Sequence, residues 1–387
     1  MNSDIKNSVI VIGGEHYNAL GVIRSLGEAN IKPYFILIAK DKICPTSYSK
    51  YIKKTFKIKS EKDEDIIDFL VNNFNDEEEK PIIIPTGDPI EKLLDTNYNK
   101  LSKKYIMPNI NETQGMIVKH MDKDVQHKLC EKYNIKTAQS FLIDLKNIDE
   151  KLNILPEKII IKPDVSADGK KSDILIVEGK EEIKNGLLEF KEKGYKNVMV
   201  QEFINYETEY AMMGMACKDK VIIPGINDNI FIYPSNRGNT SYSEMFPLAD
   251  FPIDVSPIIN MIKDMNYTGL FEVEMFKVGN EIYFNEINLR NSANLYSYMG
   301  NNVNYINVYL NLILGKDISK LKTQVDKHYY FCIEPLHLKN VKEKVVTFKE
   351  WKKHVKNSTT LIYNKKDKKP FFMRLVNSIY LRITHQL

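Results

Sequence analysis

Apolar and polar positions alternate in a regular way over the first hundred residues. Short apolar runs at 8–12, 34–39 and 81–85 alternate with segments of helical periodicity at 19–29 and 63–73. Uninterrupted apolar runs of this length are typical of strands buried on both faces of a parallel sheet. Strands therefore alternate with helices to about residue 110, which predicts a small doubly wound α/β domain.

After residue 116 the pattern changes to paired strands among fewer helices, which predicts an α+β region. A helix is expected at 121–133, with Asp122 as its N-cap. A later apolar helix at 303–314 should end at Gly315. Turn signals between apolar runs predict hairpins. The expected strands lie at 158–162, 198–204, 210–216, 220–223, 269–276 and 281–287.

Composition narrows the class of protein. A length of 387 residues suggests two or three domains. A net charge of +4 is too small to indicate nucleic acid as a partner. We find no secretory signal and no apolar run near the ~20 residues that span a bilayer. The four cysteines are far apart and form no CxxC pair, so we expect free thiols in a reducing cytoplasm.

The hairpin FEVEMFKVGNEIYFNEINLR carries the strongest chemical signal. Glu286 and Asn288 are two residues apart on one strand and face the same side, and antiparallel pairing can bring Glu274 opposite them. Such oxygen ligands suit Mg²⁺ bound with nucleotide phosphates, with Mn²⁺ as the alternative. The competing interpretation is a solvated acidic face, which is what we expect for Glu272 and Glu281.

Basic side chains near predicted element ends form a second signal. Lys123 begins a helix, and Lys162 ends the strand KIIIK, where a buried ammonium group is costly unless it meets an anion. ATP phosphates are suitable partners. Ser166 and Lys170, in the loop that follows, could fold over these phosphates, although the loop has only one glycine. Arg290 continues the alternation of the hairpin and could hold a phosphoryl group or a substrate carboxylate.

The strand VMVQEFI is the third signal. Its end can offer backbone groups of Gln201, Glu202, Phe203 and Ile204 to an adenine edge, and Glu209 could accept ribose hydroxyls. A core strand that runs into a loop is the alternative.

These three segments, in this order, resemble the ATP-grasp superfamily over roughly residues 1–315. The resemblance implies an N-terminal α/β domain (1–115), ATP-grasp subdomains at 116–200 and 201–316, and a basic extension (317–387). It implies that ATP lies between the two subdomains. It assigns Lys123 and Lys162 to phosphate, 201–204 to adenine and Glu209 to ribose. Magnesium ligands would be Glu274, Glu286 and Asn288.

Within the superfamily, residues 13–31 and 85–94 are similar to carboxylate–amine ligases related to D-aspartate ligase and the carbamoyl-phosphate-synthase-like group. This resemblance implies amide formation through an acyl phosphate, with release of ADP and phosphate. Lys162 and Arg290 would be catalytic, and an amino acid would be one of the small carboxylate and amine substrates. A phosphotransferase and a non-catalytic nucleotide-binding scaffold stay open as alternatives.

Substrate contacts and the C-terminal tail are further candidates. Gly14 and Asp88 follow predicted strand ends, where open α/β sheets bind ligands. Arg237, in a polar insertion at 227–245, could clamp a carboxylate, unless this segment is a surface loop. Residues 365–387 join a basic cluster to an amphipathic helix. This tail could contact the inner face of an anionic membrane, or dock on the protein's own core or a partner. A homodimer is also left open.

Overall fold

The computed structural model describes residues 5–40, 43–163, 174–235 and 238–383, which form two compact units. Unit 1 consists of Met1–Met121, Glu209–Glu274 and Ile287–Leu387, and unit 2 of Asp122–Thr208 and Met275–Glu286. Ser166, Lys170 and Arg237 lie outside the described residues. The four-segment division expected from the sequence stays a prediction, because the compact units divide the chain differently.

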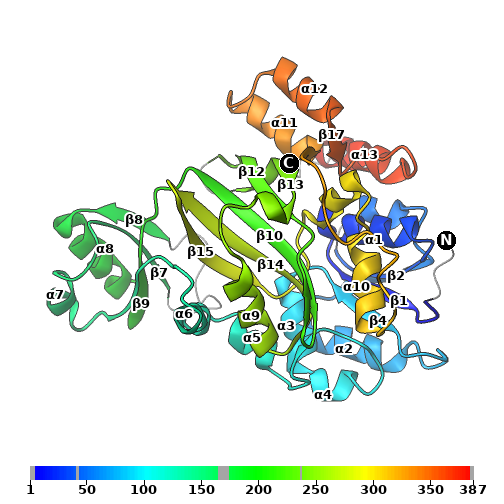
Figure 1. The fold of residues 1–387 in the computed structure, drawn as a ribbon, viewed down its shortest axis with the longest axis horizontal. Coiled ribbons are helices and arrows are strands. Elements are labelled where there is room, and N and C mark those ends of the chain that lie inside the picture. The colour runs from blue at the N-terminus through cyan, green and yellow to red at the C-terminus, as the bar shows by residue number, and fades with distance from the viewer. Residues whose placement is uncertain (1–4, 41–42, 164–173, 236–237, 384–387) are drawn as a thin grey trace. The chain divides into compact units, whose positions relative to one another are not determined.

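The N-terminal part of unit 1 is the expected doubly wound domain, with parallel strands in the order β3-β2-β1-β4 (Figure 1). Alternate side chains of β1 enter two cores: Val9 and Val11 pack on the side of α1, and Ile10 and Ile12 on the side of α2 and α3. The elements are β1 (Val9–Gly13), α1 (Tyr17–Glu28), β2 (Tyr34–Ile38), η1 (Pro45–Tyr48), β3 (Lys54–Ile58), α2 (Asp63–Asn72), β4 (Ile82–Pro85), α3 (Asp88–Thr96) and α4 (Tyr98–Leu101).

A second, largely antiparallel sheet of unit 1 has the order β15-β14-β10-β12-β13-β16-β17, with β11 paired to β10 and β5 to β14. The hairpins expected around residues 218–219 and 279–280 are both present. The strands are β5 (Asn109–Ile110), β10 (Thr208–Cys217), β11 (Lys220–Ile222), β12 (Ile226–Tyr233), β13 (Asn239–Phe246), β14 (Tyr267–Val278), β15 (Glu281–Asn288), β16 (Tyr329–Cys332) and β17 (Ser358–Thr360). The helices of unit 1 between the N-terminal domain and residue 317 include α5 (Met116–His120), η2 (Leu248–Asp250), α9 (Ser256–Asp264), η3 (Leu295–Asn301) and α10 (Tyr305–Ile313).

The polar insertion expected at 227–245 is instead an antiparallel hairpin of this sheet, made by β12 and β13. Its polar residues are compatible with a buried strand because they bond to one another. The Asn227 amide donates to Asn229 Oδ1 (2.6 Å), and Thr240 Oγ1 donates to the same oxygen (2.7 Å). Asn227, Asn229 and Thr240 therefore belong to the sheet interior rather than to a loop.

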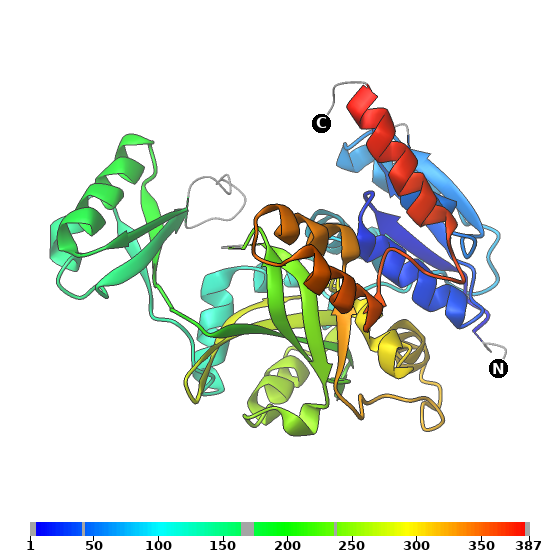
Figure 2. The same cartoon turned by 90° about the horizontal axis from the view of Figure 1, so that it is seen from above.

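The C-terminal segment, expected to be a basic extension, contributes strands to the sheet of unit 1. Strand β16 pairs antiparallel with β13, and β17 pairs parallel with β16, so the segment adds two strands to the sheet of unit 1. Helices α11 (Glu334–Lys342), α12 (Phe348–Lys356) and α13 (Lys369–Ile383) accompany these strands. Figure 2 shows α13, in red, along the N-terminal domain, where it packs against η1. Within the described ranges no helix has the length and apolar character needed to cross a bilayer.

Unit 2 is a four-stranded antiparallel sheet in the order β6-β9-β7-β8. One face packs against α7 and α8 around a core that includes Ile159, Ile161 and Phe190. Lys136 O accepts a hydrogen bond from Phe284 N (2.7 Å), which joins the tip of the β14–β15 hairpin to this unit. The elements are α6 (Lys123–Lys132), β6 (Ser140–Asp144), α7 (Ile148–Lys151), β7 (Lys158–Pro163), β8 (Leu175–Glu178), α8 (Lys180–Glu192) and β9 (Asn197–Glu202).

Candidate functional site

The N-terminus of α6 places the first candidate lysine. Asp122 is the N-cap, as expected, and its side chain accepts hydrogen bonds from the amides of Asp124 (2.8 Å) and Val125 (3.2 Å). This cap begins the helix at Lys123. Lys123 Nζ then forms an ion pair with Glu286 Oε2 at 2.8 Å, and both side chains are about one-third exposed or less. A predicted phosphate ligand and a predicted metal ligand therefore meet within unit 2.

Lys162 lies near the end of β7, on the side of the sheet opposite α8. Its Nζ donates a hydrogen bond to the neutral amide oxygen of Gln201 (2.7 Å) on the adjacent strand. The pKa of Lys162 is lowered to about 7, mainly by burial and also by the nearby Lys123, whereas Glu286 acts in the opposite direction. The surroundings of Lys162 therefore disfavour its charged form, because the nearby charges do not offset the cost of burial.

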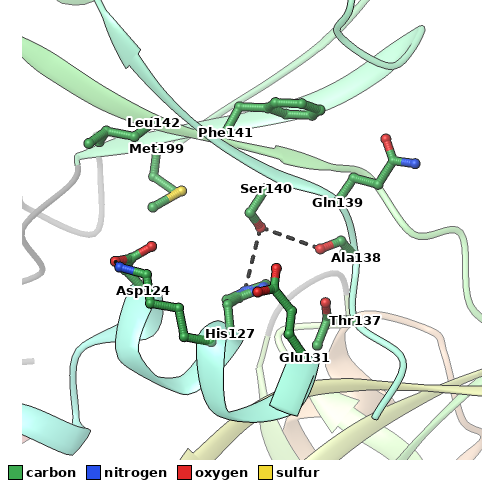
Figure 3. A pocket seen from close by; sticks show the side chains of 11 residues that line it. Asp124, His127, Glu131, Thr137, Ala138, Gln139, Ser140, Phe141, Leu142 and Met199 are labelled. Carbon is green, nitrogen blue, oxygen red and sulfur yellow. Dashed lines mark hydrogen bonds and ion pairs between the residues drawn. The ribbon is translucent and has the colours of Figure 1, made fainter. Parts of the chain in front are cut away.

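His127, one turn into α6, is close to the same charges. Burial lowers its pKa, and so do Lys162 and Lys123. Its Nε2 lies 3.5 Å from Ser140 Oγ (Figure 3). The two residues line a cavity of about 490 Å³ between α6 and the sheet, together with Asp124, Lys128, Glu131, Thr137, Ala138, Gln139, Phe141, Leu142 and Met199. No sequence pattern singles out His127.

The sheet face that carries Lys162 is also unusually apolar for a surface. Leu142 is 59% exposed and Ile176 is 51% exposed. Cross-strand pairing places Met199 beside both Leu142 and Lys162, so these side chains share one face. Exposed apolar side chains grouped next to a buried cation are more typical of a ligand-binding surface than of an ordinary solvent-exposed surface.

The segment expected to meet adenine begins at the end of β9. The amide of Glu202 donates to Gln139 O (2.8 Å), and that of Phe203 donates to Lys158 O (3.0 Å). These two amides therefore serve the structure of unit 2. Ile204 comes two residues after the last residue of the strand.

In unit 1 the hairpin strands bring Glu274 and Asn288 together. Asn288 Nδ2 donates to Glu274 Oε1 at 3.1 Å, and Asn288 Oδ1 lies 3.4 Å from Arg290 Nη2. The second segment of unit 2 ends at Glu286, and strand β15 continues from there into unit 1. Glu286 and Asn288 are thus two residues apart on one strand, as expected from the sequence.

Arg290 is compensated by several acceptors. Its Nε donates to Asp88 Oδ1 (2.5 Å), and its Nη1 donates to Asn291 O (3.2 Å). Glu272 Oε2 lies 3.9 Å from the same guanidinium group. Glu272 is 6% exposed, so the expectation of an ordinary surface residue is wrong. The period of two could have identified it, because Glu272 and Glu274 face the same side of β14.

The remaining predicted residues lie elsewhere in unit 1. Glu209 accepts a hydrogen bond from Asn229 Nδ2 (3.0 Å), which links it to the polar interior of the β12–β13 hairpin. Gly14 is exposed just after β1, and Asp88 begins α3 just after β4. The turn after β1 also holds Glu15, which lies 3.8 Å from Arg374 of α13. Arg374, which the sequence places only in the tail, therefore lies beside the turn after β1.

The donor set fits a hard divalent cation in its chemistry. Two carboxylates and an amide oxygen on neighbouring strands are ligands that Mg²⁺ prefers. Among the described residues, no group of three or more His, Cys, Asp or Glu side chains is gathered to hold a metal. Glu286 faces Lys123 and Glu274 faces the Asn288 amide, so a bound ion would have to replace these contacts.

A comparison with protein families matches the central part of the chain. A model of the ATP-grasp domain matches residues 128–294. Residues 128–294 form an ATP-grasp domain. This range contains Lys162, the 201–204 segment and the whole β14–β15 hairpin, whereas Lys123 precedes it.

The chain is similar to curated proteins with two different activities. A formate-dependent phosphoribosylglycinamide formyltransferase from Prochlorococcus marinus is 23% identical over 234 residues, 56% of this chain and 55% of the relative. A D-aspartate ligase from Enterococcus faecium is 25% identical over 222 residues, 53% and 52% of the two chains. The chain thus spans about half the length of these curated relatives.

A solved structure extends the similarity to most of the fold. The biotin carboxylase domain of the Hydrogenobacter thermophilus 2-oxoglutarate carboxylase, in complex with MgADP, ADP and bicarbonate, has a TM-score of 0.63 at 15% identity. The match covers 85% of this chain and 75% of the other. At this identity the likeness establishes the fold alone.

Proposed function

We propose that this protein is an ATP-dependent ligase that joins a small carboxylate substrate to an amine. The observation that carries the proposal is Lys162, a largely buried ammonium group hydrogen-bonded to a neutral amide, with a pKa of about 7. Such a group is poorly stabilised until a polyanion arrives. The D-aspartate ligase relative and the ADP-bound solved structure support ATP as that polyanion and amide formation as the reaction.

For the nucleotide, we propose that Lys123 and Lys162 bind the phosphates. The exposed apolar face around Leu142, Ile176 and Met199 would cover the purine ring. The backbone at 201–204 and Glu209 remain the proposed adenine and ribose contacts. Ser166 and Lys170 are proposed phosphate contacts from the segment outside the described residues.

For the metal, we propose Glu274, Glu286 and Asn288 as ligands of Mg²⁺, with Mn²⁺ as the alternative ion. The ion would neutralise charge on the ATP phosphates. Lys123, released from Glu286 when the carboxylate turns to the cation, would then be available to the phosphates.

The chemistry has two balanced steps. An oxygen of the substrate carboxylate attacks the γ-phosphorus, the bond to the β-phosphate oxygen breaks, and ADP leaves with an acyl phosphate remaining. The amine then attacks the acyl carbon, loses a proton, and expels inorganic phosphate to give the amide. Lys162 would hold the transferred phosphoryl group, and Arg290 would stabilise the anionic oxygen of the tetrahedral intermediate.

Unit 1 supplies the proposed substrate contacts. Asp88 accepts two hydrogen bonds from Arg290 and is more than half exposed, so it can also face the positively charged amino group of an amino-acid substrate. Gly14 and Arg237 are further proposed contacts. We propose that the reaction takes place in the cytoplasm on free small molecules.

The test is a screen of amino acids and amines for ATP-dependent phosphate release, with mass spectrometry of the product. Release that requires both a carboxylate and an amine, with an amide product, supports the ligase. A Glu286→Gln variant should lose activity, whereas Glu281→Gln, on the same strand but exposed, should keep it. Equal turnover in both variants would remove the metal assignment.

Two other functions would give different results in the same screen. ADP formation without an amine, with a stable phosphorylated product, would indicate a phosphotransferase. Saturable ATP binding without turnover on any substrate pair would indicate a nucleotide-binding scaffold. The contact between Lys123 and Glu286 favours catalysis, because a scaffold has no need of a metal ligand beside a phosphate ligand.

A further inference from the structure

Helix α13 is held firmly to unit 1 by the segment that precedes it. Asp367 accepts a hydrogen bond from Arg24 Nε (3.1 Å), and both side chains are almost completely buried. Ser49 Oγ and the amide of Lys50 also donate to the Asp367 carboxylate, at 2.8 and 3.0 Å. The chain therefore enters α13 from a fixed point, so the helix is presented in a defined orientation.

The two faces of α13 differ sharply. One face carries the buried Pro370 and includes Arg374, which lies 3.8 Å from Glu15. The opposite face is a stripe of large apolar side chains that the structure leaves exposed. The apolar stripe consists of Phe372 (54%), Leu375 (49%), Val376 (46%), Ile379 (58%) and Ile383 (72%). The spacing of three and four residues is that of one continuous helical surface.

Charge around the apolar stripe has one sign. Residues 365–383 contain six basic residues and a single acidic one, Asp367, which is buried against Arg24. Acidic groups of unit 1 near the helix are paired with its basic residues: Glu15 with Arg374 and Glu28 with Lys366. Lys365, Lys368 and Lys369 are exposed beside the start of the helix.

We propose that the apolar stripe of α13 docks on an anionic lipid membrane surface. An interfacial helix combines an exposed apolar face, basic flanking residues and low overall hydrophobicity, and α13 has all three. A second copy fits less well, because it would bring an identical basic helix against this one. Five side chains also supply far less than the ~800 Å² that each partner buries in a stable protein interface.

Docking in this orientation has a consequence for the strand-end region. Arg374 faces Glu15 in the turn after β1, on the side of α13 opposite the stripe. A membrane bound to the stripe therefore lies one helix diameter from this turn, roughly 10 Å. The turn would remain open to water-soluble ligands while the protein is membrane-bound.

Vesicle sedimentation with the full-length protein, without ATP or substrates, tests the proposal separately from the ligase activity. Vesicles of phosphatidylcholine alone are compared with vesicles that also contain phosphatidylglycerol. We expect binding to the anionic vesicles, weakened by salt, and little binding to phosphatidylcholine alone.

Two sets of variants separate the charge from the apolar contribution. Replacing Lys365, Lys368 and Lys369 by glutamine should weaken binding about 100-fold in total. The double variant Ile379→Ser and Ile383→Ser should weaken it at least about tenfold. Matched controls are Lys59, Lys100 and Lys103 replaced by glutamine, and Val345→Ser, which are exposed positions of unit 1 away from α13.

All substitutions are at exposed positions, so we expect each variant to fold. Circular dichroism melting checks this. Loss of binding in both α13 variants, but in neither control, supports the proposal. Binding that is absent, equal on both vesicle types, or unchanged in the α13 variants overturns it. Concentration-dependent dimers in sedimentation velocity that the isoleucine variant removes, without vesicle binding, would also overturn it in favour of a second copy.

Discussion

Lys162 in unit 2 and Arg290 in unit 1 are both cationic side chains predicted to act on substrates, yet their surroundings are opposite. Lys162 donates to the neutral amide of Gln201, and its pKa falls to about 7. Arg290 donates to the Asp88 carboxylate, with Glu272 nearby. Burial disfavours the charge of Arg290, but Asp88 and Glu272 outweigh this effect and raise its pKa.

The difference indicates what each cation does before ligand arrives. A buried charge without an equal counter-charge lowers the stability of the free protein and is satisfied only by an incoming anion. A buried charge with carboxylate partners is already satisfied, and it holds the surrounding groups in place. We therefore propose that Lys162 binds a polyanion, whereas Arg290 holds the groups at the end of β15 in place.

Among the variants considered, Lys162→Met should have the largest effect on activity. Without such an effect, the contrast between Lys162 and Arg290 would have no functional meaning. We expect ATP-dependent phosphate release to fall at least about 100-fold, because the γ-phosphoryl group loses its cation. The ligand-free variant should also be more stable than the wild type, by on the order of 2 kcal/mol, since a buried ammonium group has been replaced by an apolar side chain. Steady-state kinetics and thermal melting measure the two effects.

Lys196→Met is the matched control, because it removes an exposed lysine of the same unit just before β9. It should change neither activity nor stability appreciably. A Lys162→Met protein with wild-type turnover would show that this cation has no part in ATP binding.

The affinity for ATP should depend on pH in a direction set by Lys162. Below about pH 7 the ammonium form is already present in the free protein, and ATP binds it directly. Above this pH the free amine predominates, so binding must first take up a proton, and the affinity should fall by up to about tenfold per pH unit. Calorimetry in buffers of different ionisation enthalpy measures the proton uptake, which should be absent in Lys162→Met. Affinity that rises with pH would contradict this account.

Much of this contrast could be predicted from residue types at element ends. The KIIIK pattern placed Lys162 near a strand end, and the Asp122 cap placed Lys123 at a helix start, as the structure confirms. The alternation in FNEINLR placed Glu286 and Asn288 correctly on one strand. These features are local, so periodicity and capping rules are sufficient to find them.

Features that depend on contacts between distant segments could not be predicted. Asn227 and Asn229 looked like loop residues because nothing local reveals that Thr240 and Glu209 will bond to them inside the sheet. Docking of the tail on the protein's own core was one of the alternatives, and the structure shows it. Its contacts could not be named from the sequence, because the Arg24–Asp367 pair joins residues 343 positions apart. Glu272 was missed for a different reason, since its spacing from Glu274 was visible but its burial was not.

Glu272→Gln tests whether carboxylate partners stabilise the buried charge of Arg290. It removes a carboxylate that lies 3.9 Å from Arg290, while the new side-chain amide can still accept a hydrogen bond from Ser292. We expect a loss of about 2 kcal/mol in the free energy of unfolding, because a partly buried guanidinium group loses compensation. Glu281→Gln, which breaks the exposed pair with Lys136, should cost no more than ~0.5 kcal/mol. Denaturant unfolding of both variants tests the difference, and equal losses would mean that Glu272 does not compensate Arg290.

Glu91 in α3 is a buried acidic group, and its replacement should have the smallest effect on stability among these predictions. It is fully buried, its carboxylate oxygens have no hydrogen-bond partner among the described residues, and burial raises its pKa well above the usual value. At low pH the carboxyl is protonated in both the folded and the unfolded state. As the pH rises above the ordinary carboxyl pKa, the unfolded state ionises first, and the wild type loses stability.

Glu91→Met should therefore gain about 1 kcal/mol of stability at neutral pH and little at pH ~4. Melting temperatures across this range measure the gain. Its pH dependence separates loss of an unpaired carboxyl from better packing, which would act equally at all pH values. If the gain did not grow with pH, Glu91 would have to be ionised in the folded state through Arg290, and unit 1 would then hold a charge network that extends from β15 into α3.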